Sequence, residues 1–283
     1  MVSEAMLPRA AVKEVEARLT AAGCPDADFD ARELFRLATG RDVRLSDRPL
    51  DAAEAAKLEE LTVRRAAREP LQYLCGSWPF LDFELAVGPG VLCPRADTEV
   101  VAETAAEMLA GVEAPRVLDL CAGTGCLGLG VKRFCPAAQV TCVEKSPQAL
   151  RYLQANVHGT GVQAKAADVL QYWQELMPKS VQLIISNPPY LTGAEMQALM
   201  PETAHEPAMA LDGGTDGLDF YRAIAAHYRD IVCPGGWLVF EIGCAQRADV
   251  MEICRQNGWQ QVQARKDYGG NDRVVYAQRV EYI

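Results

Sequence analysis

From residue 96 onward, helix-like and strand-like segments alternate along the chain, and this alternation constrains the fold more than any other feature. The strand-like segments are short apolar runs, and the helix-like segments repeat their apolar residues at helical spacing. In order they are VAETAAEMLAG, PRVLDL, CLGLGVKRF, QVTCVE, SPQALRYLQANV, VQLIIS and GGWLVFEIG. Strands that alternate with helices form parallel βαβ units. The sequence therefore predicts an α/β fold, with an open sheet covered by helices on both faces.

The residues before this region follow other patterns. Within residues 1–70, apolar side chains recur at helical spacing, as at Val12, Val15 and Leu19, and Asp51 with Glu54 forms a capping pair for a last helix. Residues 71–95 contain a strand-prone stretch that ends at a Gly-Pro-Gly turn. We expect a helical domain over 1–70, a β-hairpin linker over 71–95 and the α/β domain over 96–283.

Composition argues against several classes of protein. The 28 Lys and Arg against 38 Asp and Glu give a net charge of -10, which repels polyphosphate and disfavours nucleic acid as a partner. No apolar run is long enough to span a membrane and no secretory signal opens the chain, so we expect a cytoplasmic protein. The ten cysteines include no CxxC pair, and the three histidines lie far apart, so we expect reduced thiols and no metal site.

A glycine-rich loop follows the first predicted strand of the α/β domain. The strand Val117–Leu120 leads into Cys121–Gly125, and then a helical pattern begins. Glycines at such a turn let the backbone approach a ligand closely, because no Cβ stands in the way. The next predicted strand ends at Glu144, 21 residues after Gly123, where a carboxylate can accept hydrogen bonds from both hydroxyls of a ribose. The pattern indicates a nucleoside cofactor.

The charge around the loop bears on which cofactor fits. GTGCLG matches the dinucleotide fingerprint GxGxxG, which leaves a nicotinamide-dependent dehydrogenase open. Asp119 stands just ahead of the loop, however, and a carboxylate suits a cationic ligand such as S-adenosylmethionine better than a pyrophosphate. Asp168, after the third predicted strand, can accept a hydrogen bond from an adenine amino group, with Val169 against the ring. A helix cap or a solvated strand end is the alternative role for Asp119, Glu144 and Asp168.

The sequence Asn187-Pro188-Pro189-Tyr190 follows the fourth predicted strand, at the sheet edge where open α/β sheets bind ligands. A planar nitrogen is a poor nucleophile and must be held with both N–H groups engaged and its lone pair aimed at the methyl donor. The Asn187 side-chain oxygen and the Pro188 carbonyl can each accept one of these hydrogen bonds, and two prolines fix that carbonyl. Tyr190 offers an aromatic face. The motif predicts methyl transfer to a planar nitrogen, with no general base required.

Further short motifs extend along the chain. They are Arg68-Glu69-Pro70 with Tyr73 and Gly76, Pro94-Arg95 with Asp97-Thr98-Glu99, Glu206-Pro207, Gly213-Gly214 with Asp216-Gly217, Glu241-Ile242-Gly243, and Asp267-Tyr268-Gly269 with Asn271 and Arg273. With DLCAGTG and NPPY, they make a sequence that resembles the HemK/PrmC protein-(glutamine-N5) methyltransferases over nearly its whole length. That family methylates the glutamine of the GGQ motif in peptide-chain release factors. The resemblance implies a Rossmann-like class I S-adenosylmethionine-dependent methyltransferase sheet, with a small N-terminal helical domain and a β-hairpin linker.

The resemblance also implies roles for the matching residues. The loop would line the methionine part of the cofactor, Glu144 the ribose, and Asp168 with Val169 the adenine, while the NPPY residues would hold the substrate glutamine. The expected cofactor-binding residues are Asp119, Cys121, Ala122, Gly123, Thr124, Gly125, Glu144, Asp168, Val169 and Asn187, and the expected catalytic residues are Asn187, Pro188, Pro189 and Tyr190.

Some residues carry a structural expectation instead. The family's loop often begins with Gly where Cys121 and Ala122 stand, so we expect the backbone there to avoid conformations that only glycine adopts easily. Arg95 and Glu99 can cap a helix or border the substrate channel, and we favour a structural role for Glu99. Asp267, Asn271 and Arg273, near the last hairpin, are expected to be structural.

The leading hypothesis is methyl transfer from S-adenosylmethionine to a release-factor glutamine, which leaves S-adenosylhomocysteine, with the helical domain gripping the protein substrate. We expect release factors as partners, no direct contact with nucleic acid or membrane, and a monomer. The nearest alternative is a methyltransferase acting on an exocyclic amine of adenine or guanine, since NPPY suits that geometry too. A nicotinamide-dependent dehydrogenase and a non-catalytic cofactor-binding module are further alternatives.

Overall fold

The computed structural model describes residues 1–281. The chain divides into two compact units. The first contains Met1–Gly76 together with Met200–His205, and the second contains Ser77–Leu199 and the residues from Glu206 onward. We refer to them as the helical unit and the sheet unit. No helix among the described residues combines the length and apolar character that crossing a membrane requires.

The helical unit is built from four helices and one 3-10 turn. They are α1 (Pro8–Ala21), α2 (Ala27–Thr39), the 3-10 turn η1 (Val43–Leu45), α3 (Ala52–Ala66) and α4 (Leu71–Cys75). Leu19 of α1, Leu34 and Phe35 of α2 and Leu58 of α3 are completely buried, as the helical spacing of apolar residues requires for faces that pack together. Gly40 ends α2 in the left-handed conformation that glycine adopts at low cost.

The segment Met200–His205 is joined to this unit by charged side chains. Glu202 accepts hydrogen bonds from Arg65 (3.0 Å) and Arg68 (2.6 Å). Arg65, with 4% of its side chain exposed, also pairs with the buried Asp30 at 2.7 Å. These ion pairs hold the pKa of Glu202 down to about 2 against the opposing effect of burial. Glu202 therefore stays ionised, and the pairs fix the segment to α3 and the turn after it.

The capping pair predicted for the third helix is present. The Asp51 carboxylate accepts from the Glu54 amide at 2.9 Å, and the Glu54 carboxylate accepts from the Asp51 amide at 3.0 Å. We expect Asp51→Ala to lower the free energy of local opening at the first turn of α3 by about 1 kcal/mol, because one backbone donor at the helix end loses its acceptor. Hydrogen exchange of the α3 amides would measure this. Asp47→Ala, at an exposed position ahead of the helix, is the matched control and should change nothing; equal effects of the two substitutions would contradict the prediction.

The sheet unit contains a seven-stranded sheet in the order β5-β4-β3-β6-β7-β9-β8. Its strands are β3 (Arg116–Leu120), β4 (Gln139–Glu144), β5 (Gln163–Ala166), β6 (Val181–Ser186), β7 (Val232–Glu241), β8 (Gln260–Lys266) and β9 (Asp272–Gln278). The first five pair in parallel, as the alternation predicts, whereas β9 lies antiparallel between β7 and β8. The carboxyl ends of β3, β4 and β6 therefore lie at the same edge of the sheet.

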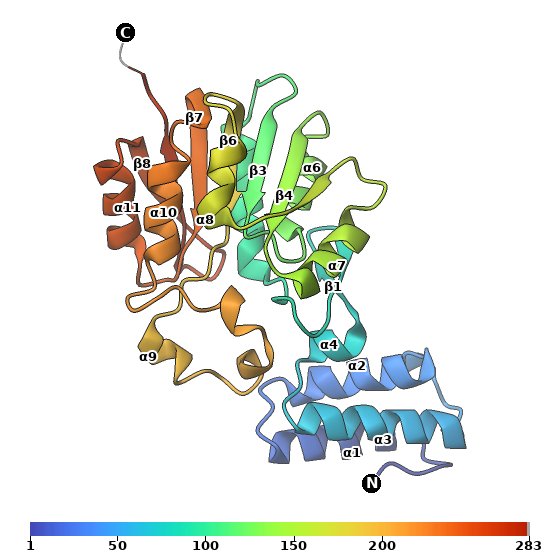
Figure 1. The fold of residues 1–283 in the computed structure, drawn as a ribbon. Helices are drawn as coiled ribbons and strands as arrows, with labels where there is room; N and C mark the ends of the chain where they lie inside the picture. Colours follow the sequence, from blue (N-terminus) through green and yellow to red (C-terminus); the bar gives the residue numbers. More distant parts are fainter. Residues whose placement is uncertain (282–283) are drawn as a thin grey trace. The chain divides into compact units, whose positions relative to one another are not determined.

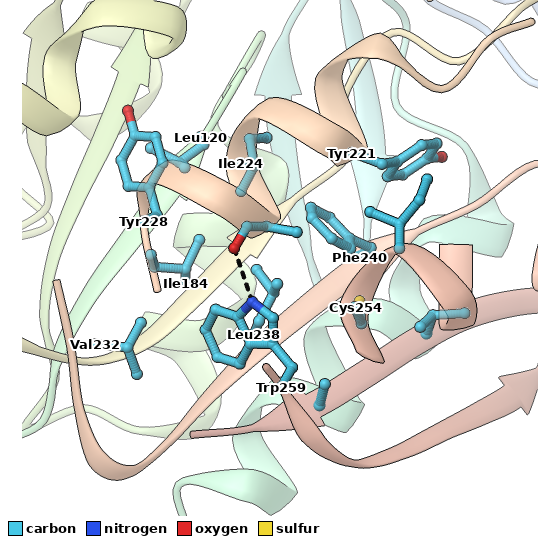
Figure 2. Close-up of a cluster of buried hydrophobic side chains, with 14 of the residues drawn as sticks. Leu120, Ile184, Tyr221, Ile224, Tyr228, Val232, Leu238, Phe240, Cys254 and Trp259 are labelled. Carbon is cyan, nitrogen blue, oxygen red and sulfur yellow. Dashed lines mark hydrogen bonds between the residues drawn. The ribbon is translucent and has the colours of Figure 1, made fainter. Parts of the chain in front are cut away.

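Helices cover both faces of this sheet. One face packs against α8 (Val169–Tyr172), α10 (Asp219–His227) and α11 (Arg247–Gln256), and the other against α5 (Glu99–Met108), α6 (Cys126–Phe134) and α7 (Pro147–Val157) (Figure 1). Figure 2 shows the first of these two cores, in which the indole N–H of Trp259 donates to the Ala225 carbonyl at 2.9 Å. Alternate residues of each central strand enter the two cores, as the strand period requires.

The predicted hairpin is formed by β1 (Ser77–Phe80) and β2 (Phe83–Ala86), and it packs on the sheet unit through the buried Phe80 and Leu85. Glu99 accepts from the Leu81 amide at its tip at 2.7 Å, so its role is structural, but it holds the hairpin and does not cap a helix. The short elements that complete the sheet unit are η2 (Ala96–Thr98), η3 (Trp173–Glu175), α9 (Gly193–Met196) and η5 (Ala208–Ala210); η4 (Thr203–His205) belongs to the helical unit.

Candidate active site

A cavity of about 300 Å³ opens at the carboxyl edge of the sheet, within the sheet unit. It brings together most of the residues singled out in the sequence. Its lining includes Asp119, Cys121, Ala122, Gly123, Thr124, Glu144, Asp168, Val169, Asn187 and Pro189. Gly125, Pro188 and Tyr190 belong to the same loops but do not line it. Segments from the ends of four parallel strands, β3, β4, β5 and β6, thus converge on one cavity.

The glycine-rich loop holds its shape through backbone hydrogen bonds. The Ala122 amide donates to Val143 at 3.0 Å, and the Gly125 amide donates to Ala122 at 2.7 Å. Gly125, with φ of 84°, is the N-cap of α6, and a Cβ there would stand 2.6 Å from Leu153. The expectation for Cys121 is wrong, because this residue has φ of 60°, in the left-handed region. A non-glycine residue can occupy that region at a cost of about 1–2 kcal/mol, which the fixed ends of the loop impose on Cys121.

Asp119 is 1% exposed at the base of the loop. Its Oδ2 accepts from the Gly128 amide at 2.9 Å and from the Cys142 thiol at 3.6 Å, whereas its Oδ1 is buried with no hydrogen-bond partner. Burial raises the pKa of this carboxyl to about 7. An unpartnered carboxylate oxygen in the wall of a cavity is a site where a cation is stabilised, because the charge is otherwise expensive to bury.

Glu144 is fixed in the cavity wall by two backbone amides. Its Oε2 accepts from Gly123 at 2.8 Å and its Oε1 from Ser146 at 2.7 Å. Each carboxylate oxygen has a second lone pair, so the group can still accept two further hydrogen bonds. This geometry suits a pair of neighbouring hydroxyl groups.

Asp168 caps a helix, which is the alternative that the sequence left open. Its Oδ1 accepts from the Leu170 amide at 3.0 Å at the start of α8, and its Oδ2 lies 2.8 Å from the Lys145 ammonium group. Both oxygens therefore have partners, although the residue also borders the cavity. Val169, 6% exposed, presents an apolar surface beside it.

The NPPY segment begins at the end of β6 beside the glycine-rich loop. The hydroxyl of the buried Ser186 donates to the Leu120 carbonyl at 2.6 Å and so joins the two loops. Asn187 lines the cavity. Tyr190 instead packs behind the wall, where burial raises its pKa to about 12.

Further residues border the cavity, among them Arg95, for which a place beside the substrate channel was one of two expected roles. The Arg95 guanidinium lies in the wall and donates to Glu206 at 2.7 Å, and the second oxygen of Glu206 accepts from the Cys93 amide at 3.1 Å. Thr98 and Met209 also line the cavity. The short motifs around Arg95 and Glu206 were visible in the sequence, but nothing in their spacing shows that the two side chains pair beside the cavity.

Asp267, Asn271 and Arg273 hold the turn between β8 and β9, away from the cavity wall. Asp267 accepts from the Asn271 amide at 2.9 Å and from the Arg273 guanidinium at 3.1 Å. Arg273 also donates to the Ile242 carbonyl at 3.3 Å, which ties the turn to the end of β7. The ten cysteines are free thiols. Residues 1–281 hold no group of three or more His, Cys, Asp or Glu side chains arranged to bind a metal ion.

Comparison with known proteins agrees with this arrangement. Residues 10–76 match the family described as PrmC N-terminal domain, and residues 88–214 match the methyltransferase small domain. The chain is 40% identical to a release factor glutamine methyltransferase of Geobacter sulfurreducens, over 81% of this chain and 80% of that protein. It is 35% identical to the enzyme of that name from Moorella thermoacetica, over 98% of this chain and the whole of that protein.

A third relative, from Mycolicibacterium smegmatis, carries the same name and is 38% identical over 96% of this chain and 98% of its own length. Identity at this level over nearly complete chains extends through both units, including the helical unit that precedes the sheet. The chain therefore belongs to the family of release factor glutamine methyltransferases.

Proposed function

We propose that this protein transfers a methyl group from S-adenosylmethionine to the side-chain amide nitrogen of the glutamine in the GGQ motif of peptide-chain release factors. The observation that carries the proposal is the position of Asn187, whose side-chain amide borders the same cavity as the glycine-rich loop, with Ser186 joining the two loops. Methylation of nucleic-acid amines is not favoured, because the relatives over the whole chain bear the release-factor name.

The cavity wall suits the parts of S-adenosylmethionine, which supplies an already activated methyl group when bound. The unpartnered Oδ1 of Asp119 favours the cationic methionine part, beside the backbone of Cys121–Gly125. Glu144, fixed by two amides, accepts from the ribose hydroxyls. Val169 packs against the adenine, with Asp168 at its border. S-adenosylhomocysteine is then the product.

On the substrate side, the chain acts by holding the glutamine amide in place. The Asn187 side-chain oxygen and the Pro188 carbonyl each accept one N–H of the amide, which turns the nitrogen lone pair towards the methyl donor. Pro189 keeps the turn rigid, and Tyr190 supports it from behind. The released proton needs no dedicated base, because the methylated amide is acidic until it loses that proton to water.

The helical unit is proposed to bind the release factor as the substrate-recognition domain, with the hairpin as its linker to the catalytic domain. The protein is proposed to work as a monomer in the cytoplasm, where release factors act, and without direct contact with nucleic acid. A net charge of -10 supports this choice of partner over a polyphosphate.

The test is to incubate the protein with a purified release factor and S-adenosylmethionine carrying a labelled methyl group. We expect the label on the GGQ glutamine, located by peptide mass spectrometry, and none on a release factor in which that glutamine is replaced by alanine. A single-stranded DNA and an RNA are assayed in parallel. Cofactor binding without label on the glutamine, or label on a nucleobase, would overturn the proposal.

A further inference from the structure

Gln246, at the N-cap of α11, uses its whole side-chain amide within the sheet unit. Its Oε1 accepts from the Gly243 amide at 3.0 Å and lies 3.4 Å from the Tyr221 hydroxyl, whose proton is directed to the Glu241 carbonyl at 2.9 Å. Its Nε2 donates to the carbonyls of Tyr190 at 2.9 Å and Gly217 at 3.3 Å. The amide orientation is unambiguous, because an N–H can only donate and a carbonyl can only accept. The end of the NPPY segment and the segment 217–221 therefore meet at one side chain of the turn 243–246.

The backbone that Gln246 holds is closely packed. A Cβ on Gly217 would overlap the Tyr190 carbonyl oxygen and stand 2.8 Å from the Gln246 Nε2. A Cβ on Gly213 would stand 2.7 Å from the Tyr190 Cα. Glycines on this side leave room for the Tyr190 backbone, and the Gln246 amide supplies the donor that its carbonyl needs.

The NPPY segment is thus held by a side chain at each end. At its start, the Ser186 hydroxyl donates to the Leu120 carbonyl at 2.6 Å, and at its end Gln246 donates to the Tyr190 carbonyl. Asn187 and the Pro188 carbonyl lie between these two anchors. Loss of either anchor lets the turn shift, and a misplacement of about 1 Å at a reacting group can cost about a hundredfold in rate.

We propose that Gln246 is a positioning residue for amide methylation: its hydrogen bond to the Tyr190 carbonyl fixes the turn that presents Asn187 and the Pro188 carbonyl to the substrate. The inference rests on the proposed function for the identity of the substrate. The hydrogen-bond network that carries it is independent of that identity.

Two substitutions separate the donor from the rest of the side chain. Gln246→Glu keeps the shape and the acceptor oxygen but removes the N–H donor, whereas Gln246→Leu removes both. Gln182→Glu and Gln182→Leu are the matched controls. Gln182 lies near the amino end of β6, far along the strand from Asn187, and its side chain likewise bridges neighbours by accepting from the Arg116 amide at 2.8 Å.

We expect both Gln246 variants to lower kcat for release-factor methylation about 10- to 100-fold at pH 8, with the Kd for S-adenosylhomocysteine within threefold of wild type. The Gln182 variants should stay within threefold of wild type in kcat. Equal losses at the two positions, or a Gln246 loss explained by weaker cofactor binding, would show a general structural role and overturn the proposal.

The dependence of Gln246→Glu activity on pH distinguishes a donor role from a general structural role, which would give no such dependence. The introduced carboxyl faces two carbonyl oxygens, and when protonated it supplies one O–H donor in place of the lost N–H. The activity of Gln246→Glu relative to wild type should therefore rise as the pH falls from 8.5 to 6, while that of Gln246→Leu stays flat.

Other ionisable groups near this cluster are present in the wild type as well. They are Tyr190, Tyr221 and Asp219 on α10, Glu241 at the end of β7, Cys244 after it, Arg273 on β9, and Arg247 and Asp249 on α11. These groups titrate in Gln246→Leu too, so the comparison of Gln246→Glu with Gln246→Leu isolates the introduced carboxyl. A ratio for Gln246→Glu that is flat with pH would contradict the proposed donor role.

Hydrogen exchange tests the same anchor without any substrate. Peptides that include the Tyr190 and Leu191 amides should exchange at least about tenfold faster in Gln246→Leu and remain at the wild-type rate in Gln182→Leu. Unchanged exchange would overturn the inference even if wild-type methylation is observed. If the wild type methylates no release factor but exchange responds as expected, the proposed function is what fails and the anchor stands.

Discussion

Asn187→Ala is expected to lower kcat for release-factor methylation by at least about a hundredfold while the Kd for S-adenosylhomocysteine stays within threefold of wild type. The substitution removes the side-chain oxygen that accepts one N–H of the glutamine amide, so the nitrogen lone pair is no longer aimed at the methyl donor. Because Asn187 borders the cavity without holding the glycine-rich loop, cofactor binding should survive. Single-turnover methylation with saturating cofactor measures the chemical step directly.

Asn257→Ala is the matched control. Asn257 lies at the end of α11, where its side chain donates to the Ile253 carbonyl at 2.8 Å, and it is absent from the cavity wall. This variant should keep wild-type kcat. If Asn187→Ala retained more than a third of wild-type activity, Asn187 would not be the acceptor that orients the substrate.

The second large effect concerns Asp119 and the pH dependence of cofactor binding. Burial raises the pKa of Asp119 to about 7 in the free protein, and a cationic ligand binds the ionised form. Cofactor affinity should therefore fall about tenfold per pH unit as the pH drops below 7, in a range where the ammonium group of the cofactor keeps its proton. In Asp119→Asn the affinity should be about 10- to 100-fold weaker at pH 7.5 and nearly independent of pH. Isothermal titration calorimetry between pH 5.5 and 7.5 would show this.

Glu241 provides the control for this experiment. It is also buried, 2% exposed, and burial raises its pKa to about 7 as well. It does not line the cavity, so Glu241→Gln should keep the wild-type slope of affinity against pH. If the slope were lost in Glu241→Gln and kept in Asp119→Asn, the titrating carboxyl would be Glu241, and the prediction would be contradicted.

The raised pKa of Asp119 has the opposite effect on the stability of the free protein: as the pH rises, cofactor affinity increases but stability decreases. The folded-state pKa of Asp119 lies above the ordinary value of 3.8, so the stability that this carboxyl contributes is fully present below pH 3.8 and is lost as the pH rises to about 7. Without ligand, Asp119→Asn should therefore unfold at a higher temperature than wild type at pH 8 but not at pH 4. A single residue would then weaken the free protein and strengthen its complex.

The local parts of the fold and site could be predicted from the sequence. The strand, glycine-rich loop and helix around Cys121–Gly125 follow from patterns within a few residues, as does the capping pair at Asp51. Helix capping by Asp168 was an open alternative, because a carboxylate after a strand serves a ligand or a helix end equally well.

Features that depend on distant residues could not be predicted. Gln246 reaches a carbonyl 56 positions away, and no periodicity or short motif indicates such a pairing. The insertion of β9 between β7 and β8 reverses the order of the last two strands relative to the chain. The left-handed backbone of Cys121 was missed because the closure of the loop imposes it, against the preference of the residue itself.

The attachment of Met200–His205 to the helical unit has a consequence for protein engineering. The backbone passes between the two units three times, near Gly76, Leu199 and His205, so the helical unit is not a simple N-terminal appendage. Deleting residues 1–76 would remove Arg65 and Arg68, the partners of Glu202. The segment Met200–His205 would then remain without the unit to which it is bound. A chimera that exchanges the helical unit for that of a relative must therefore transplant two pieces of sequence together, one from each side of the NPPY motif.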